Sequence, residues 1–207
     1  MDEQTNLPAD SELALKIRDR FFGGLPIETL KIVDSQKAGQ CYTNVRKTVS
    51  EKGGKPYFGW ALTYVPNYFV EALHHCVWEK PDSHIVDVTA IPFAAFETNE
   101  ITFIPQNDLK LDDVYEPTIP SLFLGISNQS KVKKYIKATR GVIIAKRKFH
   151  NLAKKIGAEV IKSNGQIMIR SGDPRIGKLH KAMERAQKEK IKAKSNLSEL
   201  INSSHGS

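Results

Sequence analysis

The chain has few cysteines and no long apolar run, and both shortages exclude whole classes of protein. Cys41 and Cys76 are the only cysteines among 207 residues, so the sequence predicts no disulfide scaffold and favours a reducing, cytoplasmic setting. No apolar run approaches the roughly 18 residues of a membrane span. The first five residues are acidic and polar, unlike the basic and then apolar start of a secretory signal.

Patterns that hold phosphates, nucleotides or metals are also lacking. Glycine pairs at 23–24 and 53–54 predict helix ends rather than phosphate-binding loops. Candidate zinc ligands are Cys41, His74, His75, Cys76, His84 and Asp87. They contain no Cys-x-x-Cys or His-x-x-x-His pair, and neighbours such as His74 and His75 face opposite sides of a strand. The sequence therefore predicts no metal and no cofactor.

Charge is distributed unequally along the chain. Residues 1–130 hold 11 basic and 18 acidic residues, a balance of 11 − 18 = −7, whereas residues 131–207 hold 20 and 5, a balance of 20 − 5 = +15. We therefore expect two domains, an acidic core of residues 1–130 and a basic region of residues 131–207. The basic region is typical of proteins that bind nucleic acid or an acidic protein, and also of a solvated helical region that binds nothing.

Periodicity predicts an α+β fold for the acidic part. Asp10 and Ser11 are N-cap candidates for a helix that runs to about Phe21. A second helix is expected over residues 42–52, so that Cys41 lies on its first turn. Runs of aromatic and β-branched residues predict strands at 57–65, 68–79, 85–91, 100–105 and 121–126. The first three of these should form an antiparallel meander.

The basic part is expected to be a helix, hairpin and helix arrangement. Helices are predicted at 131–139 and 145–156, and strands at 158–162 and 166–170 around the turn Asn164-Gly165. Asp173-Pro174 should start a last helix that ends near Ala193, with a frayed tail after Leu200. Its candidate anion-binding residues are Lys178, Lys181, Arg185 and Lys188. Because no aromatic residue lies among them, contacts to phosphate backbone or protein are favoured over base stacking.

Three residue types in the acidic part suggest chemistry. A thiol at a helix start lies where backbone N–H groups and the helix dipole favour an anion, which promotes a thiolate at Cys41. If the hairpin after the second meander strand closes around Lys80-Pro81-Asp82, His75 lies directly opposite Asp87, with about 5 Å between Cβ atoms. A nucleophile, a base and a group that orients the base would then lie together. A buried structural cysteine and a satisfied core histidine are the alternative interpretation.

These residues resemble a known superfamily. The segments that carry the resemblance are 40–45 (QCYTNV), 59–60 (GW), 71–82 (EALHHCVWEKPD) and 86–89 (VDVT). A cysteine at a helix start, followed by histidine and aspartate on successive strands, resembles compact papain-like proteins such as NlpC-type peptidases and transglutaminase-like proteins. The chain is also similar to uncharacterised bacterial and phage proteins of that type. The resemblance covers residues 36–92, less than a third of the chain.

The resemblance implies a cysteine enzyme that acts on a peptide, isopeptide or other amide bond, by hydrolysis or acyl transfer. Cys41 would attack the acyl carbon, His75 would move the proton, and Asp87 would hold the imidazole. Either Gln36 or Gln40 would add an oxyanion donor to the Cys41 N–H. Asn44, three positions after Cys41, would brace the loop or the neighbourhood of the thiol, and Trp60 and Trp78 would either wall the cleft or belong to the core. The alternatives are an inactive core with a binding function in the basic region, and a structural or inhibitory phage-type protein.

Overall fold

The computed structural model describes residues 4–90, 99–108, 117–163 and 166–204, and the side chains of 162–168 and 204 are left undescribed. The fold is mixed α+β, as expected. It divides into two compact units. We call residues 4–108 and 121–127 the sheet unit, and residues 117–120 and 128–204 the helical unit.

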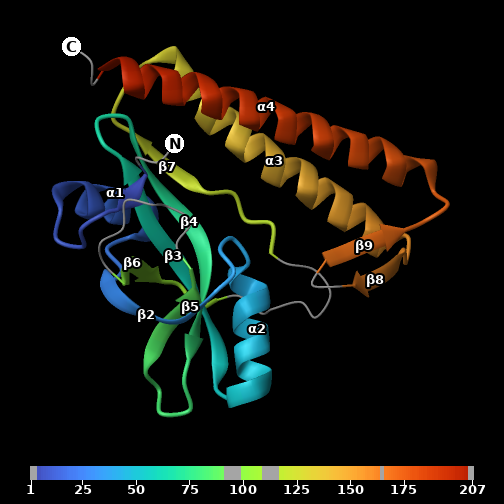
Figure 1. The fold of residues 1–207 in the computed structure, drawn as a ribbon, viewed down its shortest axis with the longest axis horizontal. Coiled ribbons are helices and arrows are strands. Elements are labelled where there is room, and N and C mark those ends of the chain that lie inside the picture. Colours follow the sequence, from blue (N-terminus) through green and yellow to red (C-terminus); the bar gives the residue numbers. More distant parts are fainter. Residues whose placement is uncertain (1–3, 91–98, 109–116, 164–165, 205–207) are drawn as a thin grey trace. The chain divides into compact units, whose positions relative to one another are not determined.

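The sheet unit is a seven-stranded sheet that closes on itself. Its strands are β1 (Thr5–Asn6), β2 (Glu28–Gln36), β3 (Lys55–Val65), β4 (Phe69–Glu79), β5 (Ile85–Thr89), β6 (Glu100–Pro105) and β7 (Leu122–Gly125). Hydrogen bonds link β3, β6, β2, β5 and β4 in this order, and β4 pairs again with β3, so these five strands form a closed barrel. β2 and β5 are parallel and the other pairs antiparallel, while β1 extends β3 and β7 extends β4 (Figure 1).

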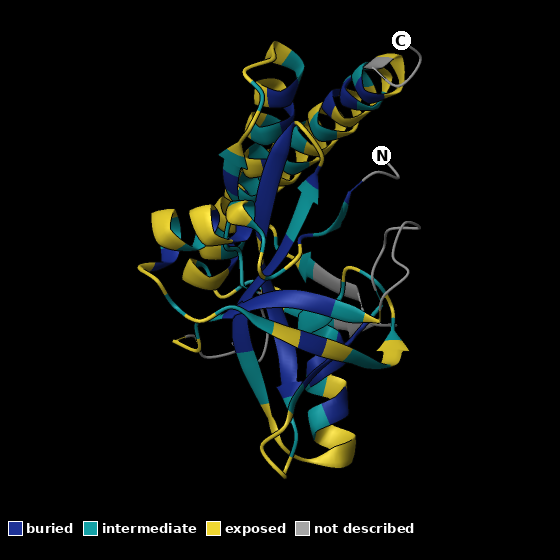
Figure 2. Cartoon of the chain, turned by 90° about the vertical axis from the view of Figure 1, so that its left-hand side faces the viewer, coloured by how far each residue is buried: buried dark blue, intermediate teal, exposed yellow. Residues whose placement is uncertain are grey.

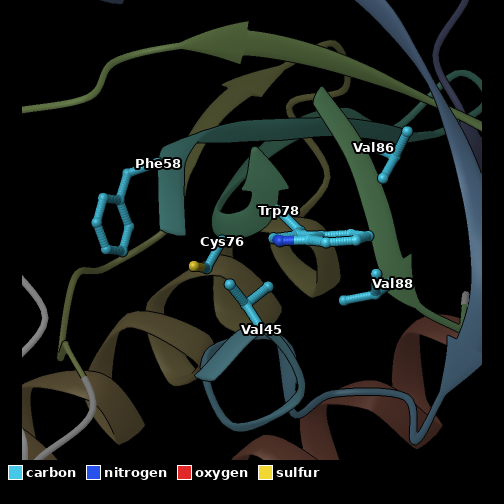
Figure 3. Packing of buried hydrophobic residues seen from close by; sticks show 6 residues of the cluster. All are labelled: Val45, Phe58, Cys76, Trp78, Val86 and Val88. Carbon is cyan, nitrogen blue, oxygen red and sulfur yellow. The ribbon is translucent and has the colours of Figure 1, made fainter. Parts of the chain in front are cut away.

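Two apolar clusters lie on the two faces of the barrel wall. The inner cluster takes residues from all five barrel strands, among them Leu30, Ala61, Val77, Phe103 and Ile85. The outer cluster packs helix α2 (Cys41–Lys52) onto the wall. Its buried members are Val45 from α2 and Phe58, Cys76, Trp78, Val86 and Val88 from three strands (Figure 3). Because side chains alternate along β4, Val77 and Cys76 belong to different clusters.

Most expected elements of the sheet unit are confirmed. Helix α1 (Glu12–Phe22) begins after Ser11, whose hydroxyl accepts a hydrogen bond from the Ala14 N–H, and it ends at Gly23 in the left-handed conformation. The strands expected at 57–65, 68–79, 85–91, 100–105 and 121–126 correspond to β3 to β7, with residue 91 outside the described residues. The sequence did not predict β2, because its polar second half, from Asp34 onwards, interrupts the alternation that marks a strand.

The helical unit is built on two long helices with a hairpin between them. Helices α3 (Ser130–Lys155) and α4 (Pro174–Ser204) pack side by side, and β8 (Glu159–Ser163) pairs with β9 (Gln166–Arg170) (Figure 1). Phe149, Ala153 and Ile176 form the centre of a small core between the helices and the hairpin. The hairpin is confirmed, although its turn residues Asn164 and Gly165 lie outside the described residues.

Two predictions for the helical unit were wrong. We expected separate helices at 131–139 and 145–156, but α3 continues through Gly141, because the buried positions Val132, Tyr135 and Thr139 continue in the same spacing to Phe149. The last helix does not end near Ala193 with a frayed tail after Leu200. It continues to Ser204, because Ala193, Leu197 and Ile201 are buried at four-residue steps, and residues 205–207 of the expected tail lie outside the described residues.

Exposure differs between the elements. Buried residues run through β3 and β4, whereas β2 and the helices have many exposed residues (Figure 2). In the described part of the chain, every helix is too short or too polar to cross a membrane.

Candidate active site

Cys41 is the first residue of α2, as the sequence predicted. Gln40 is the N-cap, and the first hydrogen bond of the helix runs from the Asn44 N–H to the Gln40 carbonyl at 2.9 Å. The N–H of Cys41 precedes this bond and therefore lies at the positive end of the helix dipole. The thiol is partly exposed, whereas Cys76 is fully buried.

His75 and Asp87 are in contact, but not as directly opposed residues. The predicted register paired Glu79 with Ser83 and His75 with Asp87, whereas in the structure Glu79 pairs with Ile85 and Trp78 with Val86. The predicted register was thus wrong by two residues. Because an even shift leaves every side chain on its original face, His75 and Asp87 still share one face of the sheet.

The turn between β4 and β5 explains the shift. The Lys80 N–H bonds to the His84 carbonyl at 2.9 Å, so the loop centres on Asp82 rather than on Pro81. Ser83 adopts a left-handed conformation with φ of 67°, which is typical of the last position of a three-residue hairpin loop. The Asp82 side chain accepts a hydrogen bond from the His84 N–H and holds this turn.

The His75–Asp87 contact is short and buried. His75 Nε2 lies 2.8 Å from Asp87 Oδ2, and the two residues are 8% and 1% exposed. The Cys41 thiol acts on the same imidazole, because its charge and its hydrogen bonding are among the causes that raise the pKa of His75. Burial alone would lower the pKa of His75, but the charges of Asp87 and Cys41 and the hydrogen bonds to both raise it well above its usual value.

The contacts assign a role to each ring nitrogen of His75. A carboxylate only accepts hydrogen bonds, so Nε2 carries the proton that is donated to Asp87. This leaves Nδ1 for the thiol of Cys41. In the neutral ring Nδ1 has no proton and can therefore accept one from the thiol.

The strand pairing explains how α2 reaches this ring. His75 shares the face of Val77, and Asp87 that of Ile85, so both point toward the inner side of the barrel wall. Cys41 packs with the outer cluster. Among the described residues, β4 and β5 are paired only at Trp78–Val86 and Glu79–Ile85, and beyond these pairs β5 follows β2 instead. The separation of the two strands begins next to His75 and leaves this side of the wall open toward α2.

A second set of hydrogen bonds holds Asp87 in place. Its Oδ1 accepts a hydrogen bond from the Thr89 N–H at 2.9 Å. The Thr89 hydroxyl accepts one from the Asn44 side chain at 3.1 Å, and the same amide donates to the Lys37 carbonyl at 2.8 Å. Asn44 therefore braces the loop before Cys41 and connects α2 to the Asp87 strand. The sequence singled out Asn44 but missed Thr89, whose position two residues after Asp87 was the available signal.

His74 lies in a different environment from its neighbour. Its Nδ1 is 2.7 Å from the hydroxyl of Tyr42, and its ring packs edge-on against Trp60 with 5.0 Å between centroids. Burial, and next the charge of His75, lower the pKa of His74 to about 4, against a smaller opposite effect of Asp108. A neutral ring at His74 cannot repel an imidazolium at His75.

The four other cleft and oxyanion candidates are placed as follows. The Gln36 amide donates to the Thr48 hydroxyl at 2.7 Å, which ties it to the middle of α2. Gln40 is adjacent to Cys41, and its side chain makes no cap to the helix. Trp60 donates to the Gln106 side chain at 2.7 Å and packs on His74. Trp78 donates to the Gly53 carbonyl at 2.9 Å and so lies at the other end of α2 from Cys41.

The predicted anion-binding residues lie on α4. Lys178, Lys181, Arg185 and Lys188 are all exposed, and their spacing places them on one side of the helix. Within the residues that the structure describes, no group of three or more His, Cys, Asp or Glu side chains is arranged to hold a metal ion.

Comparisons of the chain with protein-family models, with curated proteins and with solved structures gave no match.

Proposed function

We propose that the protein is a cysteine-dependent acyl-transfer enzyme of papain-like type. The observation that carries the proposal is that one imidazole, that of His75, lies 2.8 Å from the carboxylate of Asp87 and has its pKa raised by both Asp87 and the Cys41 thiol. This is the arrangement of a nucleophile, a general base and an orienting group. The papain-like assignment rests on the resemblance of the segments around these residues.

The proposed reaction starts with the transfer of the thiol proton to Nδ1 of His75. The thiolate of Cys41 attacks the carbonyl carbon of an amide, and the carbonyl oxygen takes the negative charge. The N–H of Cys41 donates to this oxygen, with Gln40 as the adjacent side-chain candidate. The C–N bond then breaks, the amine leaves with the proton from His75, and a thioester remains on Cys41.

The thioester is resolved by a second nucleophile. Water gives hydrolysis, and an amine gives acyl transfer; in both cases His75 removes a proton and returns it to the sulfur of Cys41 as the C–S bond breaks. Asp87 remains a carboxylate throughout and keeps the Nε2 proton in place. The proposed substrates are peptides, isopeptides or other amides.

Thiol labelling tests the proposal without a known substrate. Below about pH 7, iodoacetamide should alkylate Cys41 much faster than Cys76, which is fully buried and whose pKa is raised by burial. His75→Ala should slow the labelling of Cys41, whereas His84→Ala should leave it unchanged, because His84 is exposed and pairs with Asp82 on the β4–β5 turn. Equal and slow labelling of both thiols would contradict the proposal.

An activated ester tests the acyl-enzyme step itself. Incubation with p-nitrophenyl acetate should add one acetyl group to Cys41, as a mass increase that hydroxylamine removes, and His75→Ala should reduce this acetylation. Cys76→Ala should not affect it. Acetylation that persists in the Cys41→Ala variant at the same rate would assign the reaction to another residue.

A further inference from the structure

The helical unit has a groove along α3 and α4 that takes no part in the chemistry of Cys41. Its volume is about 1010 Å³. The cations that line it are Lys131, Lys133, Lys134, Lys137, Arg140 and Lys192. Among the described lining residues, Glu189 is the one acid. Five of the six cations come from α3 and only Lys192 from α4.

The charge of α3 is not explained by helix stability. Residues Ser130–Lys155 include ten lysines and arginines and no aspartate or glutamate, so no ion pair can form within this helix. Several of these cations lie in the first two turns, where the helix dipole favours acidic side chains instead. The sequence thus places positive charge where it lowers the stability of an isolated helix, which suggests a role in binding.

The cations form a row rather than a scattered set. Lys133, Lys137 and Arg140 are four and three residues apart, so they project from the same side of α3 at steps of about 5 Å. Lys133, Lys134 and Lys137 are exposed. The small residues Ala138 and Gly141 also line the groove, together with Ala193 of α4. They leave space for a polymer to lie close to the helix backbone.

We propose that this groove binds the phosphodiester backbone of a nucleic acid. A nucleic acid has an anion at every nucleotide and therefore meets each cation of a row, whereas an acidic protein has to match the row with carboxylates. The described lining includes no aromatic side chain, so the bases are not stacked and their sequence is not read. From Ser130 to Ile144 the helix is about 21 Å long, which corresponds to about six nucleotides at the 3.4 Å spacing of one strand.

This site differs from the one that the sequence suggested on α4. Lys178, Lys181 and Arg185 do not line this groove, and Lys188 lines a smaller groove of about 470 Å³ along the same two helices. Lys178, Lys181 and Arg185 are exposed and carry the same charge as Lys133, Lys134 and Lys137. The two triplets are therefore a matched pair for an experiment.

The test measures binding of the full-length chain to fluorescent oligonucleotides of about 20 nucleotides, as single-stranded DNA, single-stranded RNA and duplex DNA. The groove variant replaces Lys133, Lys134 and Lys137 by glutamate, and the control variant replaces Lys178, Lys181 and Arg185 by glutamate. We expect the groove variant to bind about tenfold or more weakly, and the negative slope of log affinity against log salt to become shallower by about three. The control variant should keep most of the affinity.

Circular dichroism verifies that both variants keep their helices. A second groove variant with glutamine at the same three positions should lose less affinity than the glutamate variant but more than the control. A preference among the three oligonucleotides identifies the nucleic acid that the groove takes. Equal losses in the groove and control variants would overturn the proposal, as would undetectable binding of all three oligonucleotides at about 50 mM salt. Tighter binding of polyglutamate than of the oligonucleotides would assign the groove to an acidic protein and overturn it too.

Discussion

His75 Nε2 lies 2.8 Å from Asp87 Oδ2, although the two residues are not opposite each other in the β4–β5 ladder. The ladder pairs Glu79 with Ile85, so a continued register would place Thr89 opposite His75, two residues beyond Asp87. The contact is therefore diagonal. Diagonal neighbours are within reach of long side chains, and here the separation of β4 and β5 allows the ring to turn toward the carboxylate.

Asp87→Asn should disable His75 without unfolding the sheet unit. The asparagine oxygen can still accept the Thr89 N–H, but its amide would donate to Nε2 and move the ring proton to Nδ1. His75 then cannot accept the thiol proton. We expect the alkylation of Cys41 near neutral pH to slow by about tenfold or more. Mass spectrometry measures this rate as the incorporation of iodoacetamide at Cys41.

The same protein provides a matched control for this change. Asp82 is 3.2 Å from His84 in an exposed pair on the β4–β5 turn. Asp82→Asn should leave the labelling rate of Cys41 within experimental error. If Asp87→Asn labels as fast as the unchanged protein, Asp87 does not set the tautomer of His75.

The sequence predicted the faces of the His75 and Asp87 side chains better than it predicted the register. Cys41, His75 and Asp87 were identified from a helix start and from strand alternation, both of which are local patterns. The position of the turn was not predictable in this way, because the left-handed Ser83 and the Asp82 side chain decide it and serine rarely adopts this conformation. The face of each side chain was predicted because the error was even.

Contacts between segments far apart in sequence were the main omission. β2 pairs in parallel with β5 and so closes the barrel, but neither its polar second half nor its parallel partner has a local signal. The link from Asn44 to Thr89 also joins residues 45 positions apart. For α3, the sequence predicted two helices, but a buried seam continues on both sides of Gly141 and outweighs the cost of one glycine, which is about 1 kcal/mol.

Asn44→Ala should destabilise the sheet unit, because it leaves the Lys37 carbonyl and the Thr89 hydroxyl without this donor. The expected loss in the free energy of unfolding is about 2 kcal/mol. Thr89→Val removes only the second of these bonds and should cost about 1 kcal/mol. Urea unfolding followed by tryptophan fluorescence measures both, since Trp60 and Trp78 are the only tryptophans and both lie in this unit. A larger loss for Thr89→Val than for Asn44→Ala would contradict this assignment.

His74 should make the sheet unit sensitive to acid. Its pKa is about 4 in the folded protein, against about 6.5 in the unfolded chain. Between these values the unfolded chain binds more protons, so stability falls as the pH drops from 6.5 to 4, by about 3 kcal/mol from this residue. His75 has the opposite effect at higher pH. Because its pKa is raised in the folded protein, the folded protein binds more protons than the unfolded chain above pH 6.5, and stability falls as the pH rises.

The variant that checks this is His74→Gln, which does not titrate and keeps an acceptor for the Tyr42 hydroxyl. Its urea midpoint should change less than that of the unchanged protein between about pH 7 and pH 4.5. Tyr42→Phe removes the same hydrogen bond but leaves the titrating ring, so it should remain acid-sensitive. Identical acid sensitivity of His74→Gln and the unchanged protein would show that His74 is not the group responsible.

Gly59→Ala should destabilise the barrel next to the site. Gly59 lies opposite His75 in the β3–β4 ladder, and a Cβ there would overlap the Ile104 carbonyl oxygen and the Phe103 ring. Because both belong to the neighbouring strand β6, either β6 has to move or the inner cluster has to repack. We expect a loss of about 2–3 kcal/mol in the free energy of unfolding.

Gly125→Ala is the control in the same unit, since the nearest atom to its Cβ would be 4.0 Å away. An added methyl there should change stability by less than about 1 kcal/mol, and equal effects of the two substitutions would contradict the close approach of β6 to Gly59.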